Sequence, residues 1–154
     1  MNLFELHGTE IITESKINDI NTIKSKIESR LNSMKARTYV SDNVITFSTL
    51  KFYVPSGSLK DRRDSLRIIK EGCIDISKES QSLKISWTVK LDSLYFLALC
   101  SSIVSGIVAS LSSDAVISVG IGIIYFLAFV FAGIVLIKVQ LNGLINSSVY
   151  RNYH

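Results

Sequence analysis

The sequence predicts an α+β cytosolic domain, with one amphipathic helix on an antiparallel sheet, followed by a hairpin of two transmembrane helices. The distribution of charge is the first observation behind this prediction: residues 1–90 hold 15 of the 17 Lys and Arg and 11 of the 13 Asp and Glu. Residues 94–137 hold a single charge, Asp114. The charged part shows one helical stripe and several strand-like runs, and the uncharged part consists of two long apolar runs.

The helix of the domain, which we place within residues 1–91, is indicated by apolar residues spaced three and four apart. These residues are Ile17, Ile20, Ile23, Ile27, Leu31 and Met34. Ser15 precedes them as a candidate N-cap, and the opposite face is polar. We therefore expect this helix to cover one face of a sheet. A coiled-coil seam is the alternative, but the stripe spans fewer than three heptads.

Runs rich in apolar and β-branched residues predict strands at residues 3–12, 37–40, 44–54, 73–77 and 83–91. The first run is broken at Gly8. Turn-forming residues separate the second run from the third and the fourth from the fifth. The last run is the clearest, because its apolar residues alternate with Lys, Ser and Thr. Such alternation is typical of an antiparallel sheet with one buried and one solvated face.

Residues 94–111 and 116–137 are the two predicted membrane spans, with 18 and 22 residues and no charge. As helices they extend roughly 27 and 33 Å, close to the hydrocarbon thickness of about 30 Å. A buried hairpin in a soluble protein is the alternative, but a domain of this size cannot cover two helices that are apolar all round. The four-residue connection makes the helices antiparallel neighbours, and Ser113 or Asp114 can cap the second.

Basic residues predict the orientation of the hairpin. Lys84, Lys90, Lys138 and Arg151 flank the ends away from the connecting loop, which has no Lys or Arg. The positive-inside bias then places both termini in the cytoplasm, in a multi-pass protein of the cell (inner) membrane. The N-terminus shows no signal-peptide pattern, so we expect the helices to drive insertion.

The segments that adjoin the hairpin predict how it is joined to the domain. Residues 138–154 form an amphipathic tail, in which the second helix continues and an apolar stripe packs on the domain or on a neighbouring subunit. That stripe comprises Leu141, Leu144, Ile145 and Val149. Only Asp92 and Ser93 separate the last strand from the first span. A ligand or partner that moved the sheet would therefore move the hairpin.

Small and polar residues in the spans are candidates for helix packing or for lining a pore. They are Ser101, Ser102, Ser105, Gly106, Ala109, Gly122 and Tyr125. Small residues let helix backbones approach closely, and hydroxyls can bond across the interface. One interpretation is packing within the hairpin, and the other is an oligomeric seam or a water path. Tyr125 lies near the middle of its span, where we expect a serine of the first helix to be its partner.

The densest basic stretch offers a candidate site for lipid headgroups or for a phosphate-bearing ligand. Its basic residues are Lys60, Arg62, Arg63, Arg67 and Lys70. Asp61 and Asp64 neutralise part of this charge, so a solvated loop or short helix is the alternative.

The sequence shows no pattern of an enzyme, and we expect no cofactor. His7 and His154 lie apart from other metal-binding residue types, so we expect no metal site. The net charge of +4 favours attraction to an anionic membrane surface over binding of a nucleic acid duplex. Cys73 lies in a predicted strand of the soluble domain and Cys100 lies in the first predicted span, so we expect no disulfide between them. Two unpaired thiols fit a reducing compartment.

In layout, a soluble domain joined to two apolar helices, the chain resembles the small two-helix membrane effectors of bacterial defence systems. That resemblance implies a compact cytosolic domain that controls membrane disruption, although in several such effectors the helices precede the domain. We therefore expect a non-enzymatic membrane protein whose cytosolic domain senses a ligand or partner and controls the packing of membrane helices, as a homo-oligomer or with a membrane-protein partner. The alternative is an accessory or scaffold subunit that anchors a larger membrane complex.

Overall fold

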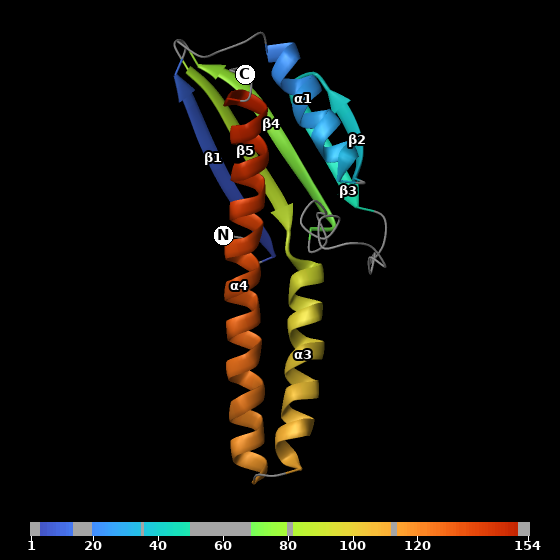
Figure 1. Ribbon diagram of the computed structural model, residues 1–154, viewed down its shortest axis with the longest axis vertical. Coiled ribbons are helices and arrows are strands. Elements are labelled where there is room, and N and C mark those ends of the chain that lie inside the picture. The colour runs from blue at the N-terminus through green and yellow to red at the C-terminus, as the bar shows by residue number, and fades with distance from the viewer. Residues whose placement is uncertain are drawn as a thin grey trace.

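The computed structural model describes residues 4–13, 20–34, 36–49, 69–79, 82–111 and 114–150. The described part is an antiparallel five-stranded sheet with three helices, two of them long, apolar and C-terminal (Figure 1). In chain order the elements are β1 (Glu5–Thr13), α1 (Ile20–Ser33), β2 (Ala36–Ser41), β3 (Val44–Thr49), β4 (Glu71–Glu79), β5 (Ser82–Lys90), α3 (Asp92–Ser110) and α4 (Ala115–Tyr150).

The strands lie in the order β1-β5-β4-β3-β2, and every neighbouring pair is antiparallel. The predicted break at Gly8 is wrong, because β1 pairs with β5 without interruption from Glu5 to Thr13. Gly8 lies opposite Trp87, and a Cβ atom at Gly8 would come within 2.2 Å of the indole ring. Glycine is therefore present to admit the ring, not to end the strand.

The termini of the predicted elements differ modestly from those observed. The stripe residues Ile23, Ile27 and Leu31 are buried in α1, while Ser15 and Ile17 lie outside the described residues. The fourth strand is longer than predicted on both sides and reaches Glu79. The third is described only to Thr49, so the rest of the predicted run to residue 54 falls outside the described part.

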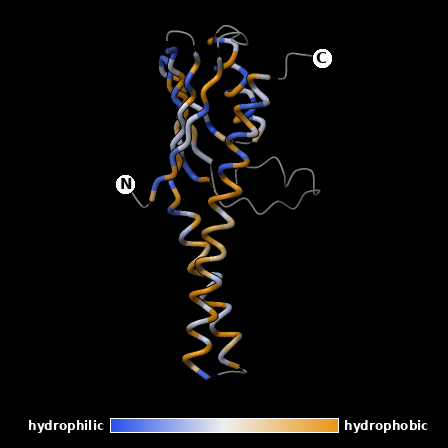
Figure 2. The backbone as a smooth tube through the Cα atoms, turned by 90° about the vertical axis from the view of Figure 1, so that its left-hand side faces the viewer, coloured by the Kyte–Doolittle hydropathy of each residue, from blue (hydrophilic) through white to orange (hydrophobic). Residues whose placement is uncertain are grey.

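One face of the sheet carries both α1 and the C-terminal part of α4 (Figure 1). The inward residues of β5, among them Ile85, Trp87 and Val89, belong to one buried cluster with those of both helices. The Arg30 side chain donates a hydrogen bond to the Ser147 hydroxyl and ties α1 to α4. The opposite face of the sheet is covered by none of the described helices (Figure 2).

Helix α4 is continuous over 36 residues and has two different surroundings along its length. Its first part projects beyond the sheet beside α3, and Ile124, Leu127 and Phe131 there are more than half exposed (Figure 2). Its last part lies against the sheet, where the predicted stripe of Leu141, Leu144, Ile145 and Val149 is buried in the core together with Ile137. Helix α4 therefore runs from an exposed apolar part into the interior of the sheet domain. We call this exposed part of α4, together with α3, the shaft.

The joint between β5 and α3 is shorter than the two-residue tether that the sequence predicts. Helix α3 begins at Asp92, immediately after Leu91, and the Tyr95 amide donates to the Leu91 carbonyl at 3.0 Å. Leu94 is fully buried against Gly133 of α4, where a Cβ atom would meet the Leu94 side chain at 2.2 Å. These contacts hold β5, α3 and α4 together at the joint.

Both C-terminal helices are long and apolar enough to cross a membrane, α3 over Asp92–Ser110 and α4 over Ala115–Val149. Within the most apolar stretch of each, only 11% of the residues are buried inside the protein. In the core helix of a soluble protein most residues of such a stretch would be buried, whereas most of these residues are exposed.

Candidate functional site on the open sheet face and in the helix groove

The open face of the sheet presents its side chains in cross-strand rows. The first row lies at the end of the sheet next to α3. From one edge strand to the other it comprises Glu5, Lys90, Glu71, Ser48 and Arg37. Directly opposite side chains on one face of a sheet lie about 5 Å apart, so neighbouring members of the row are close in space. Acidic and basic groups alternate over β1, β5 and β4, and the neutral Ser48 then separates Glu71 from Arg37.

The Lys90 ammonium and the Glu71 carboxylate form the ion pair at the centre of this row, at 2.7 Å. The hydrogen bond from Lys90, with its positive charge, lowers the pKa of Glu71, and the same contact raises the pKa of Lys90. Both side chains are about half exposed, so solvent screens the pair. The ion pair therefore fixes the positions of these two side chains on the open face and adds little to the stability of the fold.

The second row contains no Lys, Arg, Asp or Glu, and its three middle residues are small. It comprises His7, Thr88, Cys73, Thr46 and Tyr39. His7 and Thr88 are hydrogen-bonded at 2.8 Å, and the Thr46 hydroxyl donates to the Tyr39 carbonyl at 3.2 Å. Because the middle of this row is small, the two rows enclose a hollow of about 460 Å³.

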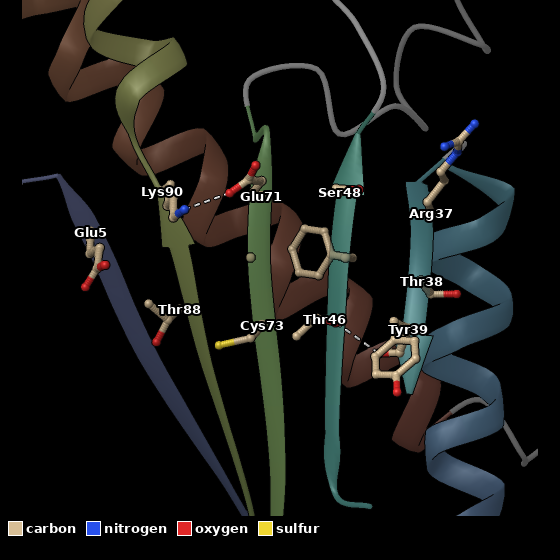
Figure 3. Close-up of a pocket in the computed structure, with 12 residues that line it drawn as sticks. Glu5, Arg37, Thr38, Tyr39, Thr46, Ser48, Glu71, Cys73, Thr88 and Lys90 are labelled. Carbon is tan, nitrogen blue, oxygen red and sulfur yellow. Dashed lines mark hydrogen bonds and ion pairs between the residues drawn. The ribbon is translucent and has the colours of Figure 1, made fainter. Parts of the chain in front are cut away.

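Figure 3 shows this hollow, with Tyr39 and Arg37 on one edge strand and Lys90 and Glu71 toward the other side. Tyr39 is 70% exposed, and Arg37 is also exposed. The hollow combines hydroxyls, one thiol, aromatic rings and charges of both signs on a mainly apolar surface, which suits a ligand or protein surface with both apolar and polar groups. The described residues include no group of three His, Cys, Asp or Glu that could hold a metal ion.

The groove between α3 and α4 brings together part of the predicted small-residue set. A Cβ atom on Gly122 would lie 3.2 Å from the Ser102 carbonyl oxygen, and one on Gly106 would lie 3.6 Å from that of Ser118. These close approaches place both glycines where the two helices pack against each other. A groove of about 610 Å³ remains open along the same seam.

The hydroxyls of Ser102, Ser105 and Ser110 donate to carbonyls of their own helix, α3. Ser102 donates to the Leu99 carbonyl at 2.9 Å, and Ser105 donates to that of Ser101 at the same distance. Ser101, Ser105 and Ala109 are half-buried and lie outside the lining of the groove. A serine hydroxyl that donates to a carbonyl of its own helix needs no hydrogen-bond partner on another helix, even in an apolar medium.

The side chain of Tyr125 is 54% exposed. The hydrogen bonds of the described serines of α3 include none with Tyr125, so the expected serine partner is not found among the described residues.

Of the predicted basic site, four members lie outside the described residues: Lys60, Arg62, Arg63 and Arg67. Lys70 is described and exposed, and its carbonyl accepts a hydrogen bond from the Thr49 amide at 2.8 Å. The structure thus gives the place of one member of this set.

Comparison with protein-family models, with curated proteins and with solved structures finds no match. Any function of this chain is therefore inferred from the arrangement of its own residues.

Sequence reasoning missed the rows on the open sheet face. The alternation of β5 predicted a solvated face, but the cross-strand neighbours depend on the register of four strand pairs. A register is set by turns and by packing between distant segments, and a single sequence does not show it. The opposite charges of Glu71 and Lys90, 19 residues apart, were the one available signal.

Proposed function

We propose that this chain is a two-span membrane protein whose sheet domain controls the packing of its membrane helices. In this proposal both termini are cytoplasmic, the copies self-associate in the cell membrane, and the sheet domain responds to a ligand or partner. The protein acts by mechanical coupling and not as an enzyme. The result of that coupling is a change in membrane permeability.

The observation that carries the proposal is the shared core of sheet and hairpin. The end of α4 is buried with the inward face of β5, and α3 starts directly from that same strand. Leu94 and Gly133 fasten the two helices to each other at the level of the joint. A displacement of β5 therefore reaches both helices through packed contacts, which is the physical requirement for coupling between sites.

Exposure of the apolar shaft supports lipid as its surroundings. Leaving large apolar side chains in water costs about 25 cal/mol for each Å² of surface, and many such side chains line the shaft. Phe4 and Tyr95 pack edge to face at the end of the shaft, with ring centroids 5.6 Å apart. Aromatic residues collect at this depth in membrane proteins, at the border of hydrocarbon and headgroups.

Release of a trapped dye from liposomes tests the permeability part of the proposal. We expect leakage from vesicles that contain the full chain once its copies are clustered, for example by a bivalent antibody to an N-terminal tag. The control is the chain with Leu141→Asp, in which the sheet is no longer packed on α4. No leakage in any clustered state would contradict control of permeability.

The open hollow on the sheet favours a second candidate function, that of a scaffold subunit anchoring a larger membrane complex. A bare sheet face with mixed charge fits a protein surface with both apolar and polar groups. The mass of the chain after mild detergent extraction separates the two functions. A homo-oligomer supports the first, and stable co-purification with a larger partner supports the second.

A further inference from the structure

The two edge strands, β1 and β2, carry the exposed large apolar residues of the sheet domain. Outside α3, α4 and the loop that joins them, the described residues of this kind are Phe4, Ile11, Tyr39 and Val40. Phe4 directly precedes β1, Ile11 lies within it, and the other two lie in β2. The central strands expose none among the described residues, so apolar exposure in this domain is confined to its edges.

Strand β1 has few of the features that normally protect an edge from pairing, although it carries Glu5 and Glu10, and Glu10 lies on the inward face opposite Ile85. The strand is nine residues long and contains no Pro and no Lys. Its register with β5 is continuous from Glu5 to Thr13, so no bulge twists it away. A long regular edge presents a row of unpaired backbone N–H and C=O groups, which is a template for another strand.

The direction of the edges restricts which strands can pair. Because the sheet has five strands and every neighbour is antiparallel, β1 and β2 run in the same direction. The strands also run roughly along the axis of the helix hairpin (Figure 1). A rotation about that axis brings β1 of one copy beside β2 of the next, and the two strands are then parallel.

Pairing of identical edges is excluded for copies in one membrane. Two β1 strands related by a twofold axis pair as an antiparallel ladder, and that axis is perpendicular to the sheet. This twofold axis would lie in the plane of the membrane, so the hairpins of the two copies would point in opposite directions. Only the unlike edges, β1 and β2, can join while every hairpin enters the same bilayer.

The charges at the ends of the first row are complementary. Glu5 lies at the β1 end and Arg37 at the β2 end, on the same face and in the same cross-strand row. Rotation about the strand direction without sliding places Arg37 of one copy beside Glu5 of the next. The alternating row of charges would continue across the junction, and opposite charges directly opposite each other favour a strand pair.

We infer that the sheet domains of neighbouring copies join edge to edge, β1 of one copy pairing in parallel with β2 of the next around the membrane normal. The partner of each edge is a second copy of this chain. The inference rests on the proposed function, since the membrane fixes the axis of rotation. An extended segment of another protein on β1 is the alternative occupant.

A charge-reversal cycle tests the junction. Within one chain Glu5 and Arg37 lie four strand spacings apart, roughly 19 Å, so they interact only between copies. Glu5→Arg and Arg37→Glu should each lower the yield of cross-linked oligomers in vesicles about threefold, as expected for exposed charge pairs. The variant with both reversals should recover the yield. Asp75→Lys, on the central strand β4, is the matched control and should leave it unchanged.

Disulfide trapping tests the direction of the junction. Thr9→Cys and Ser41→Cys alter outward positions of one row on the two edges, in chains with Cys73→Ser and Cys100→Ser. Cross-linked dimers should form when the two variants are mixed and should be absent from either variant alone. Dimers from the Thr9→Cys variant alone, or none from the mixture, would overturn the inference.

The same samples separate this inference from the proposed function. Extraction with alkaline carbonate releases proteins that do not cross the bilayer, and the cross-links are counted in both fractions. A chain found in the soluble fraction contradicts the proposed function, whatever its cross-links show. A chain in the membrane fraction without heterotypic cross-links contradicts the edge junction alone.

Discussion

Leu141→Asp should unfold the sheet domain while leaving the apolar hairpin in the membrane. Leu141 is fully buried in the cluster that joins α4 to β5 and α1. An unpaired carboxylate there loses its hydration and finds no described cation in the cluster, a cost of several kcal/mol. Domains are stabilised by only about 5–15 kcal/mol in total, so one such change removes most of the margin.

Protease resistance and the emission of Trp87 measure this effect, since Trp87 is the single tryptophan and is 2% exposed. We expect rapid cleavage of the domain and a shift of the emission to longer wavelength. Asn146→Asp introduces the same group on an exposed position of α4 and should leave both readings as in the native chain. Equal protease resistance of the Leu141→Asp and native chains would show that the sheet does not depend on α4.

Gly133→Leu should separate the two helices at the joint and destabilise the chain by about 1–3 kcal/mol, as for other overpacked cores. The new side chain would enter the space that Leu94 fills, and Leu94 is fully buried. Thermal unfolding in detergent measures the loss, at about 2–4 °C for each kcal/mol in a chain of this size.

Two further variants test whether the loss of stability comes from the contact between position 133 and Leu94. Gly120→Leu makes the same substitution on α4 at a position with nothing within 4 Å, and it should not lower the midpoint. Leu94→Ala combined with Gly133→Leu returns volume to the joint and should recover part of the lost stability. A similar loss for Gly120→Leu and Gly133→Leu would indicate a general effect of removing glycine from the helix.

Most of the architecture could be predicted from the sequence because it depends on local periodicity. The stripe of α1, the alternation of β5 and the two uncharged runs each lie within one segment, so each can be recognised without knowing its neighbours. The break expected at Gly8 failed for the opposite reason. A glycine that admits the Trp87 ring and a glycine that ends a strand look alike until the opposite strand is known.

The candidate sites were harder to predict, because each is formed by segments far apart in the chain. Gly122 and Gly106 are candidates for helix packing or pore lining by size alone, and the structure puts both at the seam of the hairpin. Tyr125 was assigned a partner from its depth in the span, but depth does not determine the helix face. The charged row from Glu5 to Arg37 depends on four strand registers, and no local pattern encodes them.

Labelling of the native thiol Cys100 tests the central claim most directly, because Cys100 is exposed on the surface of α3. The chain carries Cys73→Ser, and intact membrane vesicles are treated with a maleimide reagent that does not cross bilayers. If lipid surrounds the shaft, Cys100 stays unlabelled until the membrane is dissolved and the chain denatured. Rapid labelling in intact vesicles, or in a chain that stays soluble without detergent, would show that water surrounds the hairpin and would contradict the account.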